Sequence, residues 1–324
     1  MKILVADDEP LFLELMKGYL ATAGYTDVHP VSSGAEALRA IVDSAAPFDC
    51  FLLDVKMPGM DGIELCARIR ALPAHAATPI VMITSITDKS CIDRAFRAGA
   101  NDYVNKPIDR REVAARMGMV EALVSARGDA SHLMRQLGDA ASGGHGAIRL
   151  EDPVELDEAD GVMAISSMEN YLLRLGKLRG FSCAGIGLHI ENAGAIHART
   201  DGQEFLDILG EVAVAIRDSL NDTSALLSYA GNGDFCAIMS RAAQPVQADP
   251  SDLELRINDT ICQRLNLLYG GDVPIPAVRV GASQSGSLMP FDDPTALIYQ
   301  AIEAAHATRQ KGRVQRRGEY RHAI

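Results

Sequence analysis

The chain has 324 residues, 48% of them hydrophobic, which predicts about two domains, each with its own core. Its six cysteines are scattered along the sequence without paired spacing, so they predict neither disulfides nor a zinc site. Its formal net charge of -12 argues against nucleic acid as a general partner, because binding to phosphate backbones depends mainly on positive charge. No apolar run approaches the roughly 20 residues that span a bilayer, and the N-terminus lacks a signal-peptide pattern, so we expect a cytoplasmic protein without membrane association.

The first part of the chain alternates short apolar strands with amphipathic helices. Strands are expected near residues 2–6, 28–31, 50–53, 79–84 and 102–105. Helices are expected near residues 10–23, 35–43, 61–70 and 89–98, with another from about residue 109. This alternation implies an α/β domain with a doubly wound, five-stranded parallel sheet.

Five polar residues are expected at one edge of this sheet. Asp7 and Asp8 follow the first strand, Asp54 ends the third, Thr84 ends the fourth and Lys106 follows the fifth. The carboxyl ends of parallel strands share one edge, where open α/β sheets bind their ligands. Three crowded carboxylates repel one another unless a hard cation such as Mg²⁺ binds them. The site would align a phosphoryl group for in-line attack by a carboxylate oxygen, with the lysine and threonine side chains holding the phosphoryl oxygens.

These motifs resemble the receiver domain of bacterial two-component response regulators over residues 1–127. The resemblance is carried by the acidic pair, the turn after Asp54 with Met57-Pro58-Gly59 and Asp61-Gly62, the hydroxyl of Thr84, the aromatic Tyr103, and Lys106-Pro107.

The resemblance implies that Asp54 accepts a phosphoryl group from a sensor histidine kinase or a phosphotransfer protein. It implies that Mg²⁺ is bound by Asp8, Asp54 and the backbone carbonyl of Lys56, with Asp7 acting through water. It also implies that Thr84 and Tyr103 couple phosphorylation to the surface of the fourth helix, fifth strand and fifth helix.

A Gly- and Ala-rich stretch at residues 140–146 predicts a linker, which we place at residues 128–156, before a second domain at residues 157–324 that ends in a basic tail. Strands are expected near residues 183–190, 225–229, 235–239 and 277–281. Helices are expected near residues 168–175, 203–220, 252–269 and 294–310. The Asn232-Gly233 pair predicts a β-hairpin, because both residues tolerate positive φ, and the whole pattern is α+β.

This second domain resembles a GGDEF domain, the fold of diguanylate cyclases, in its frame at residues 157–162, 202–206 and 304–313. Its catalytic positions differ. The signature Gly-Gly-Asp-Glu-Phe becomes Gly231-Asn232-Gly233-Asp234-Phe235, in which Gly233 replaces the first acid. Residues 187–190 lack the family's metal-binding aspartate, Gln203 replaces the aspartate that reads guanine, and residues 222–225 lack the inhibitory Arg-x-x-Asp. Joining two GTP molecules needs acidic metal ligands, so we predict a domain without catalytic activity.

The sequence therefore predicts a response regulator whose degenerate GGDEF-like domain mediates protein interaction. We expect a homodimer, and an unidentified downstream protein as a further partner. Two alternatives remain open: a diguanylate cyclase with displaced ligands, in which Glu191 or Glu204 compensates, and a nucleotide-binding receptor without turnover. His189 and His197 are interpreted as polar surface residues and not as a metal pair.

Overall fold

The computed structural model divides the chain into two compact units, Met1–Gly146 and Ala147–Ile324, each described here by itself. The structure describes residues 1–85, 89–122, 124, 148–154, 156, 162–180, 182–222, 224–269, 274–285 and 293–319, and in these it describes all side chains except those of residues 89, 176–180, 269 and 308–319. Most of the expected linker lies outside the described residues. So do residues 157–161 of the expected GGDEF-like frame and the side chains of the basic tail.

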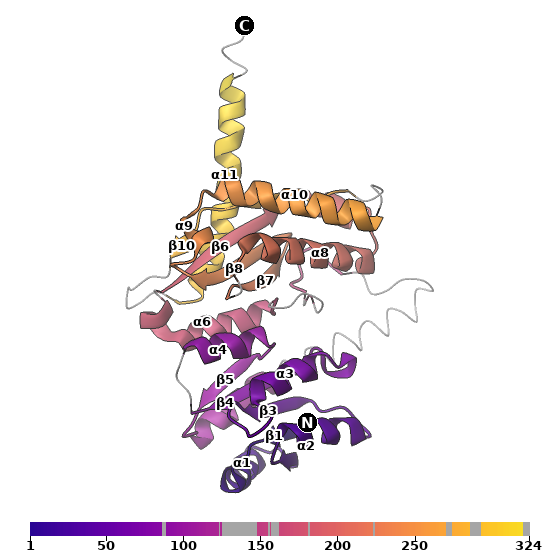
Figure 1. Cartoon of the computed structure of the whole chain (residues 1–324), viewed down its shortest axis with the longest axis vertical. Helices are drawn as coiled ribbons and strands as arrows, with labels where there is room; N and C mark the ends of the chain where they lie inside the picture. The colour runs from indigo at the N-terminus through magenta and orange to yellow at the C-terminus, as the bar shows by residue number, and fades with distance from the viewer. Residues whose placement is uncertain are drawn as a thin grey trace. The chain divides into compact units, whose positions relative to one another are not determined.

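The first unit is built on a parallel sheet of five strands in the order β2-β1-β3-β4-β5. Figure 1 labels β1, β3, β4 and β5 of this sheet. The strands are β1 (Lys2–Ala6), β2 (Asp27–Val31), β3 (Cys50–Asp54), β4 (Ile80–Thr84) and β5 (Asp102–Asn105). The helices are α1 (Pro10–Thr22), α2 (Gly34–Asp43), α3 (Gly62–Arg70), the 3-10 turn η1 (Pro73–His75) and α4 (Lys89–Arg97). Residues 110–122 are also helical. The predicted doubly wound parallel sheet is confirmed.

Apolar side chains of α1 and of the helical residues 110–122 pack on one face of this sheet. Their core includes Leu13 and Met16 from α1, Val113 and Met117 from the second helix, and the strand residue Val5, all of them buried. The central strands β3 and β4 are buried along their whole length, as expected for a parallel sheet with helices on both faces, whereas the edge strand β2 is largely exposed. The central strands therefore leave mainly their carboxyl ends to carry chemistry.

The second unit contains an antiparallel sheet in the order β10-β6-β8-β7, with β9 also paired to β6. Its strands are β6 (Cys183–Ile190), β7 (Leu226–Gly231), β8 (Asp234–Ser240), β9 (Val278–Val280) and β10 (Gln284–Ser285). Its helices are α6 (Ile165–Gly180), α7 (Ala193–His197), α8 (Gly202–Leu220), α9 (Gln244–Gln247), α10 (Pro250–Tyr269) and α11 (Ala296–Glu319). The expected β7-β8 hairpin is present, whereas α7, α9 and β10 are too short to have left a sequence pattern. Helix α11 continues to residue 319, beyond the predicted end at residue 310.

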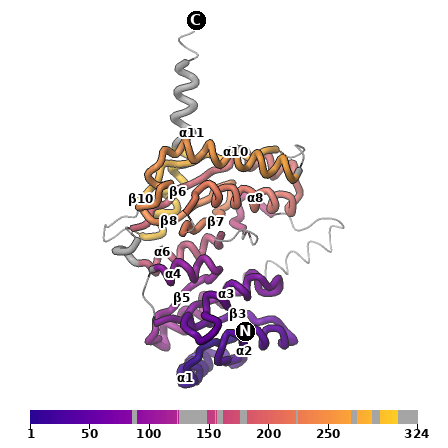
Figure 2. Tube along the Cα trace, viewed as in Figure 1, coloured from indigo at the N-terminus to yellow at the C-terminus, as the bar shows by residue number. Residues whose placement is uncertain are grey.

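Strand β6 presents different side chains to the two faces of this sheet. Ile186, Leu188 and Ile190 enter the large apolar core with α8 and α10, which lie side by side (Figure 2). The alternate residues include Gly185 and Gly187, and they face α11. A Cβ at position 187 would lie 2.0 Å from the carbonyl oxygen of residue 301, so only glycine permits this close packing.

Among the described helices, none combines the length and apolar character needed to cross a membrane.

Candidate functional site

Two acidic side chains are buried at the carboxyl edge of the parallel sheet. Asp7 follows β1 and is 0% exposed, and Asp54 ends β3 and is 3% exposed. The Asp7 backbone is anchored to β2, since its N–H donates to the Val31 carbonyl at 3.1 Å. The Asp7 carboxylate also accepts the Glu9 backbone N–H at 2.9 Å. Asp8 lies next to this pair and is exposed, so two buried carboxylates and one solvent-exposed carboxylate lie at the same edge of the sheet.

Lys106 bridges the two buried carboxylates. Its ammonium nitrogen lies 2.7 Å from Asp7 Oδ2 and 2.8 Å from Asp54 Oδ1. The same nitrogen lies 4.1 Å from the centre of the Phe12 ring, a cation–π contact. The Lys106 backbone N–H donates to the Thr84 carbonyl at 2.7 Å, which fixes the start of the lysine side chain against the end of β4. The lysine is therefore held from its backbone to its charged end.

One ammonium group faces two buried carboxylates, and the pKa values reflect this imbalance. Burial disfavours the charge of Lys106, but hydrogen bonds to Asp54 and Asp7 outweigh it and raise the lysine pKa. Burial raises the pKa of Asp54, the negative charge of Asp7 adds to it, and Lys106 only partly opposes it. The site thus retains excess negative charge that a cation or a cationic donor can compensate.

The turn after Asp54 is shaped by close backbone packing. The backbone N–H of Lys56 hydrogen-bonds to the Asp54 carboxylate, and the N–H of Gly62 donates to the Val55 carbonyl at 3.0 Å. A Cβ at Gly62 would lie only 2.0 Å from the Asp54 carbonyl oxygen. Asp61 caps α3 by accepting the Glu64 N–H at 2.7 Å. Helix α3 can therefore begin directly against the acidic strand end.

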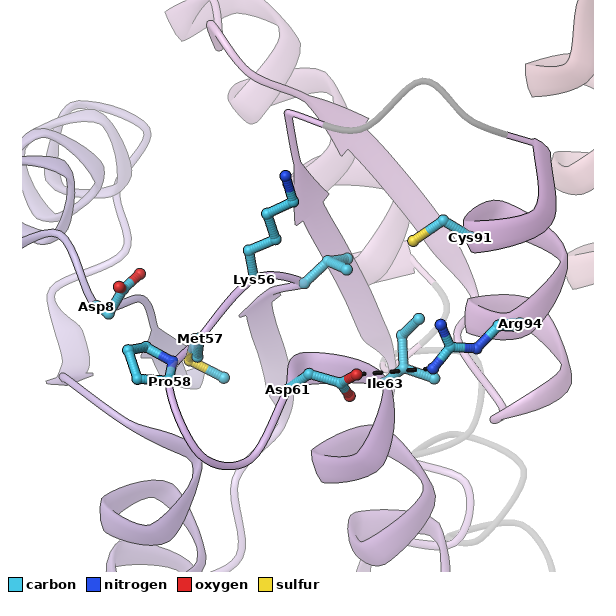
Figure 3. Close-up of a pocket in the computed structure, with 9 residues that line it drawn as sticks. Asp8, Lys56, Met57, Pro58, Asp61, Ile63, Cys91 and Arg94 are labelled. Carbon is cyan, nitrogen blue, oxygen red and sulfur yellow. Dashed lines mark ion pairs between the residues drawn. The ribbon is translucent and has the colours of Figure 1, made fainter.

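A groove of about 420 Å³ opens beside this turn (Figure 3). Asp61, at its wall, lies 3.6 Å from the guanidinium of Arg94 on α4. The lining residues are Asp8, Val55, Lys56, Met57, Pro58, Asp61, Ile63, Cys91 and Arg94. Carboxylates at Asp7, Asp8 and Asp54 and backbone carbonyls of the turn are hard oxygen donors, so the residues present fit Mg²⁺.

Comparison with known proteins identifies this unit. Residues 3–117 match the model of the response regulator receiver domain. The first domain is a response regulator receiver domain. Over 116 residues the chain is 40% identical to the transcriptional regulatory protein ResD of Bacillus subtilis (strain 168), covering 36% of this chain and 46% of ResD. It is 35% identical over 116 residues to the transcriptional regulatory protein SrrA of Staphylococcus aureus (strain NCTC 8325 / PS 47), with the same shares of 36% and 46%.

The structure of the chemotaxis response regulator CheY4 of Vibrio cholerae is 28% identical and covers 37% of this chain and 97% of that chain, with a TM-score of 0.35. The chain thus spans less than half the length of the curated relatives ResD and SrrA that it matches. The shared region is the receiver domain.

The two predicted switch residues of the receiver domain lie on adjacent strands. Thr84 ends β4 next to Ile83, which pairs with Asp54, and it is 3% exposed. Tyr103 on β5 pairs with Met82 and is 5% exposed, with its ring against Phe96 of α4 at a centroid distance of 6.2 Å. The threonine is thus near the acidic edge, and the tyrosine connects the sheet to α4.

In the second unit, residues 231–235, which the sequence analysis compared with the GGDEF signature, form a tight turn. Asn232 and Gly233 have φ values of 55° and 80°, in the left-handed region that the Asn-Gly pair predicts, and Gly231 also has a positive φ of 92°. The N–H of Gly233 donates to the buried Tyr229 hydroxyl at 3.0 Å, and burial raises the pKa of Tyr229 to about 12. Phe235 is fully buried in the core.

Asp234 lies at the start of β8 and contacts two histidines. His189 Nδ1 lies 2.8 Å from Asp234 Oδ1, and His306 Nε2 lies 2.9 Å from the same oxygen. The side chain of His189 is only 12% exposed, so the interpretation of this residue as surface is wrong. The sequence places His306 only within the frame at residues 304–313 and gives it no role in a site. The alternation of side chains along β6 places His189 on the same face as Gly185 and Gly187, and this placement can be read from the sequence. The approach of α11 to that face cannot, because it depends on tertiary packing.

The other residues singled out for the second domain do not join this group. His197 is half-buried, with Nε2 2.6 Å from the Ile148 carbonyl. Glu191 pairs with Arg279 at 2.9 Å, and Glu204 lies in the first turn of α8, where its backbone N–H donates to Asp201. Asp234 is therefore the one carboxylate among residues 231–235 of the hairpin.

Proposed function

We propose that the chain is a response regulator that is phosphorylated on Asp54 by a sensor histidine kinase or a phosphotransfer protein. The observation that carries this proposal is the buried Asp54, joined to Asp7 through the Lys106 ammonium inside a receiver domain. Receiver domains bind Mg²⁺, and Asp8, Asp54 and the Lys56 carbonyl would hold it here, with Asp7 acting through water. The ion would supply positive charge against the phosphoryl oxygens.

The residues of the chain account for the transfer itself. An ionised oxygen of Asp54 attacks phosphorus, an O–P bond forms, and the N–P bond of the donor phosphohistidine breaks with its electron pair leaving on nitrogen. Lys106 lies next to the attacking oxygen and offers a point charge to the phosphoryl oxygens. The Thr84 hydroxyl, one strand away, can donate a hydrogen bond to them.

Phosphorylation would change the surface of α4 and β5 through Thr84 and Tyr103. Engagement of the threonine by the phosphoryl group shifts the population between two arrangements of this surface. The Tyr103 ring contacts the Phe96 ring, and this contact connects the sheet to α4, so a rearrangement of Tyr103 would change the packing of this helix. Dimerisation or exposure of the second domain is the proposed consequence.

For the second unit we propose a degenerate GGDEF-like domain that acts through protein contacts and not as a diguanylate cyclase. Two features of its hairpin support this proposal. A side chain at Gly233 would meet the Ala193 Cβ at 2.6 Å, so the missing acid has no room. The turn is also covered by the chain's own residues 148–152, since Asn232 N–H donates to the Leu150 carbonyl at 2.6 Å and a Cβ at Gly231 would lie 2.2 Å from the Glu151 carbonyl oxygen.

ResD and SrrA are named as transcriptional regulatory proteins, but the region they share with this chain covers 46% of each. We propose a homodimer and a downstream protein as partners, and we retain the expectation that the chain does not bind nucleic acid, based on its net charge of -12.

The test is to treat the full chain with beryllofluoride and Mg²⁺, measure its mass by light scattering, then add GTP and analyse the products by chromatography. We expect a change of oligomeric state that Asp54→Ala abolishes, and no cyclic dinucleotide. Identical behaviour of the wild type and Asp54→Ala would refute regulation through Asp54. A cyclic dinucleotide that disappears in Asp234→Ala would instead establish a cyclase with displaced ligands, and a thermal shift with GTP but no product would establish a nucleotide receptor.

A further inference from the structure

We propose that His189, Asp234 and His306 form a binding site for one divalent transition-metal ion, with Zn²⁺ as the ion that fits best. Their potential ligand atoms all lie within 4.8 Å of one another, the only group of this kind among the residues that the structure describes. All three residues belong to the second unit.

The three side chains come from three elements that meet at the end of the second sheet. His189 on β6 and Asp234 on β8 are direct cross-strand partners, so both side chains point to the same face. His306 reaches them from α11, and the two imidazole rings lie 4.3 Å apart at an angle of 46°. Both histidines direct one nitrogen to the same carboxylate oxygen.

Glycines on the sheet determine how closely α11 approaches. A Cβ at Gly187 would lie 2.0 Å from the Ala301 carbonyl, and one at Gly281 would lie 2.4 Å from the backbone nitrogen of Ala305. Ala301 and Ala305 are fully buried in this contact. The residue after Ala305 is His306, so the tight packing of small residues holds the backbone of His306 next to the site.

The donor set selects the type of ion. Two imidazole nitrogens and one carboxylate suit Zn²⁺, whereas Mg²⁺ prefers oxygen ligands and waters. Zn–N and Zn–O bonds of about 2.0–2.1 Å in a tetrahedral site separate the ligand atoms by about 3.3 Å. The present separations of 2.8 and 2.9 Å would have to widen by about half an ångström. The His306 side chain is 41% exposed and can move by that amount.

Three protein ligands leave a fourth position of a tetrahedral ion open. The exposed side of His306 gives an ion access from solvent and leaves room for a water or an exchangeable anion at that position. Arg279 pairs with His189 across β6 and β9, but its guanidinium lies 2.9 Å from Glu191, which neutralises its charge. The cation next to the site therefore does not exclude a metal ion.

The same contacts can exist without a metal, as two imidazole N–H groups donating to one carboxylate, and the experiment separates these cases. The full chain is stripped with a chelator, excess Mg²⁺ is added to fill the receiver site, and Zn²⁺ affinity is measured by competition with a chromophoric chelator. The variants are His306→Ala, which removes a partly exposed ligand with little risk to folding, and Asp234→Asn. The matched control is His29→Ala, which removes a surface histidine 2.8 Å from Asp27 in the receiver domain.

We expect one Zn²⁺ per chain in the wild type and in His29→Ala. Loss of a residue that only hydrogen-bonds to a metal ligand weakens metal affinity by about 10- to 100-fold. Removal of the His306 ligand itself should therefore weaken Zn²⁺ affinity by at least this factor. Co²⁺ should give a visible absorption band of a tetrahedral N/O site in the wild type, and His306→Ala should remove it. Wild-type affinity in His306→Ala, or failure of the wild type to retain Zn²⁺, would overturn the proposal. Circular dichroism of each variant verifies that the chain is folded.

Discussion

The close approach of Gly62 to Asp54 makes Gly62→Ala a sharp test of how the acidic edge is built. The new Cβ would lie 2.0 Å from the Asp54 carbonyl oxygen, 1.4 Å less than the 3.4 Å at which ordinary contact begins. The obstacle is a backbone atom and not the end of a flexible side chain, so the strand end and α3 must move apart. Overpacking of this kind costs about 1–3 kcal/mol, which corresponds to about a 5- to 150-fold change in the folding equilibrium.

Thiol labelling can measure this loss in the receiver domain alone. Cys50 and Cys66 are fully buried on β3 and α3, whereas Cys183 and Cys236 are buried in the second sheet and report on the other unit. In moderate urea, we expect Gly62→Ala to speed the labelling of the first pair by about 5- to 150-fold and to leave the second pair unchanged.

The matched control is Gly18→Ala, on the exposed side of α1, where an added Cβ meets nothing within 4 Å. Alanine favours a helix interior over glycine by about 0.5–1 kcal/mol, so this variant should slow the labelling of the receiver thiols. Displacement of Asp54, the proposed phosphoacceptor, should also reduce beryllofluoride binding, since a shift of about 1 Å can cost about 100-fold in reactivity. If Gly62→Ala labels as slowly as the wild type and binds beryllofluoride equally well, the close contact does not constrain the site.

Three further predictions follow from the buried polar groups. Lys106→Met leaves two buried carboxylates without their ammonium partner, so the receiver domain should lose about 3–5 kcal/mol of stability in urea unfolding, and added Mg²⁺ should restore part of it. The raised pKa of Asp54 means that the folded state binds the Asp54 proton more tightly than the unfolded state does. The free energy of unfolding should therefore fall as pH rises from the ordinary carboxyl range through the raised pKa. Calorimetry should show that Asp54→Asn weakens this pH dependence. Tyr229→Phe leaves the Gly233 N–H unpaired and should cost about 1–3 kcal/mol in urea unfolding. Tyr299→Phe removes a hydroxyl that donates to Glu169 at the exposed surface and should change stability by less than about 0.5 kcal/mol.

The sequence by itself determined the first domain almost completely. Apolar runs ended in Asp54 and Thr84, and alternation with helices required a parallel sheet, so the shared edge followed from topology alone. The hairpin at Asn232-Gly233 was equally local, because its positive φ values are a property of two residue types.

Only the tertiary structure decided which of these residues touch and how their charges balance. The sequence named Asp7, Asp54 and Lys106, but the lysine bridge between the two acids depends on the distances across three strand ends. His306 shows the limit most clearly, since 72 positions separate it from Asp234. Its contact exists because glycines on β6 and beyond β9 let α11 pack against the sheet at backbone distance. Helix and strand periodicity report which face a residue occupies, whereas the distance between two faces is set by the packing of side chains from both.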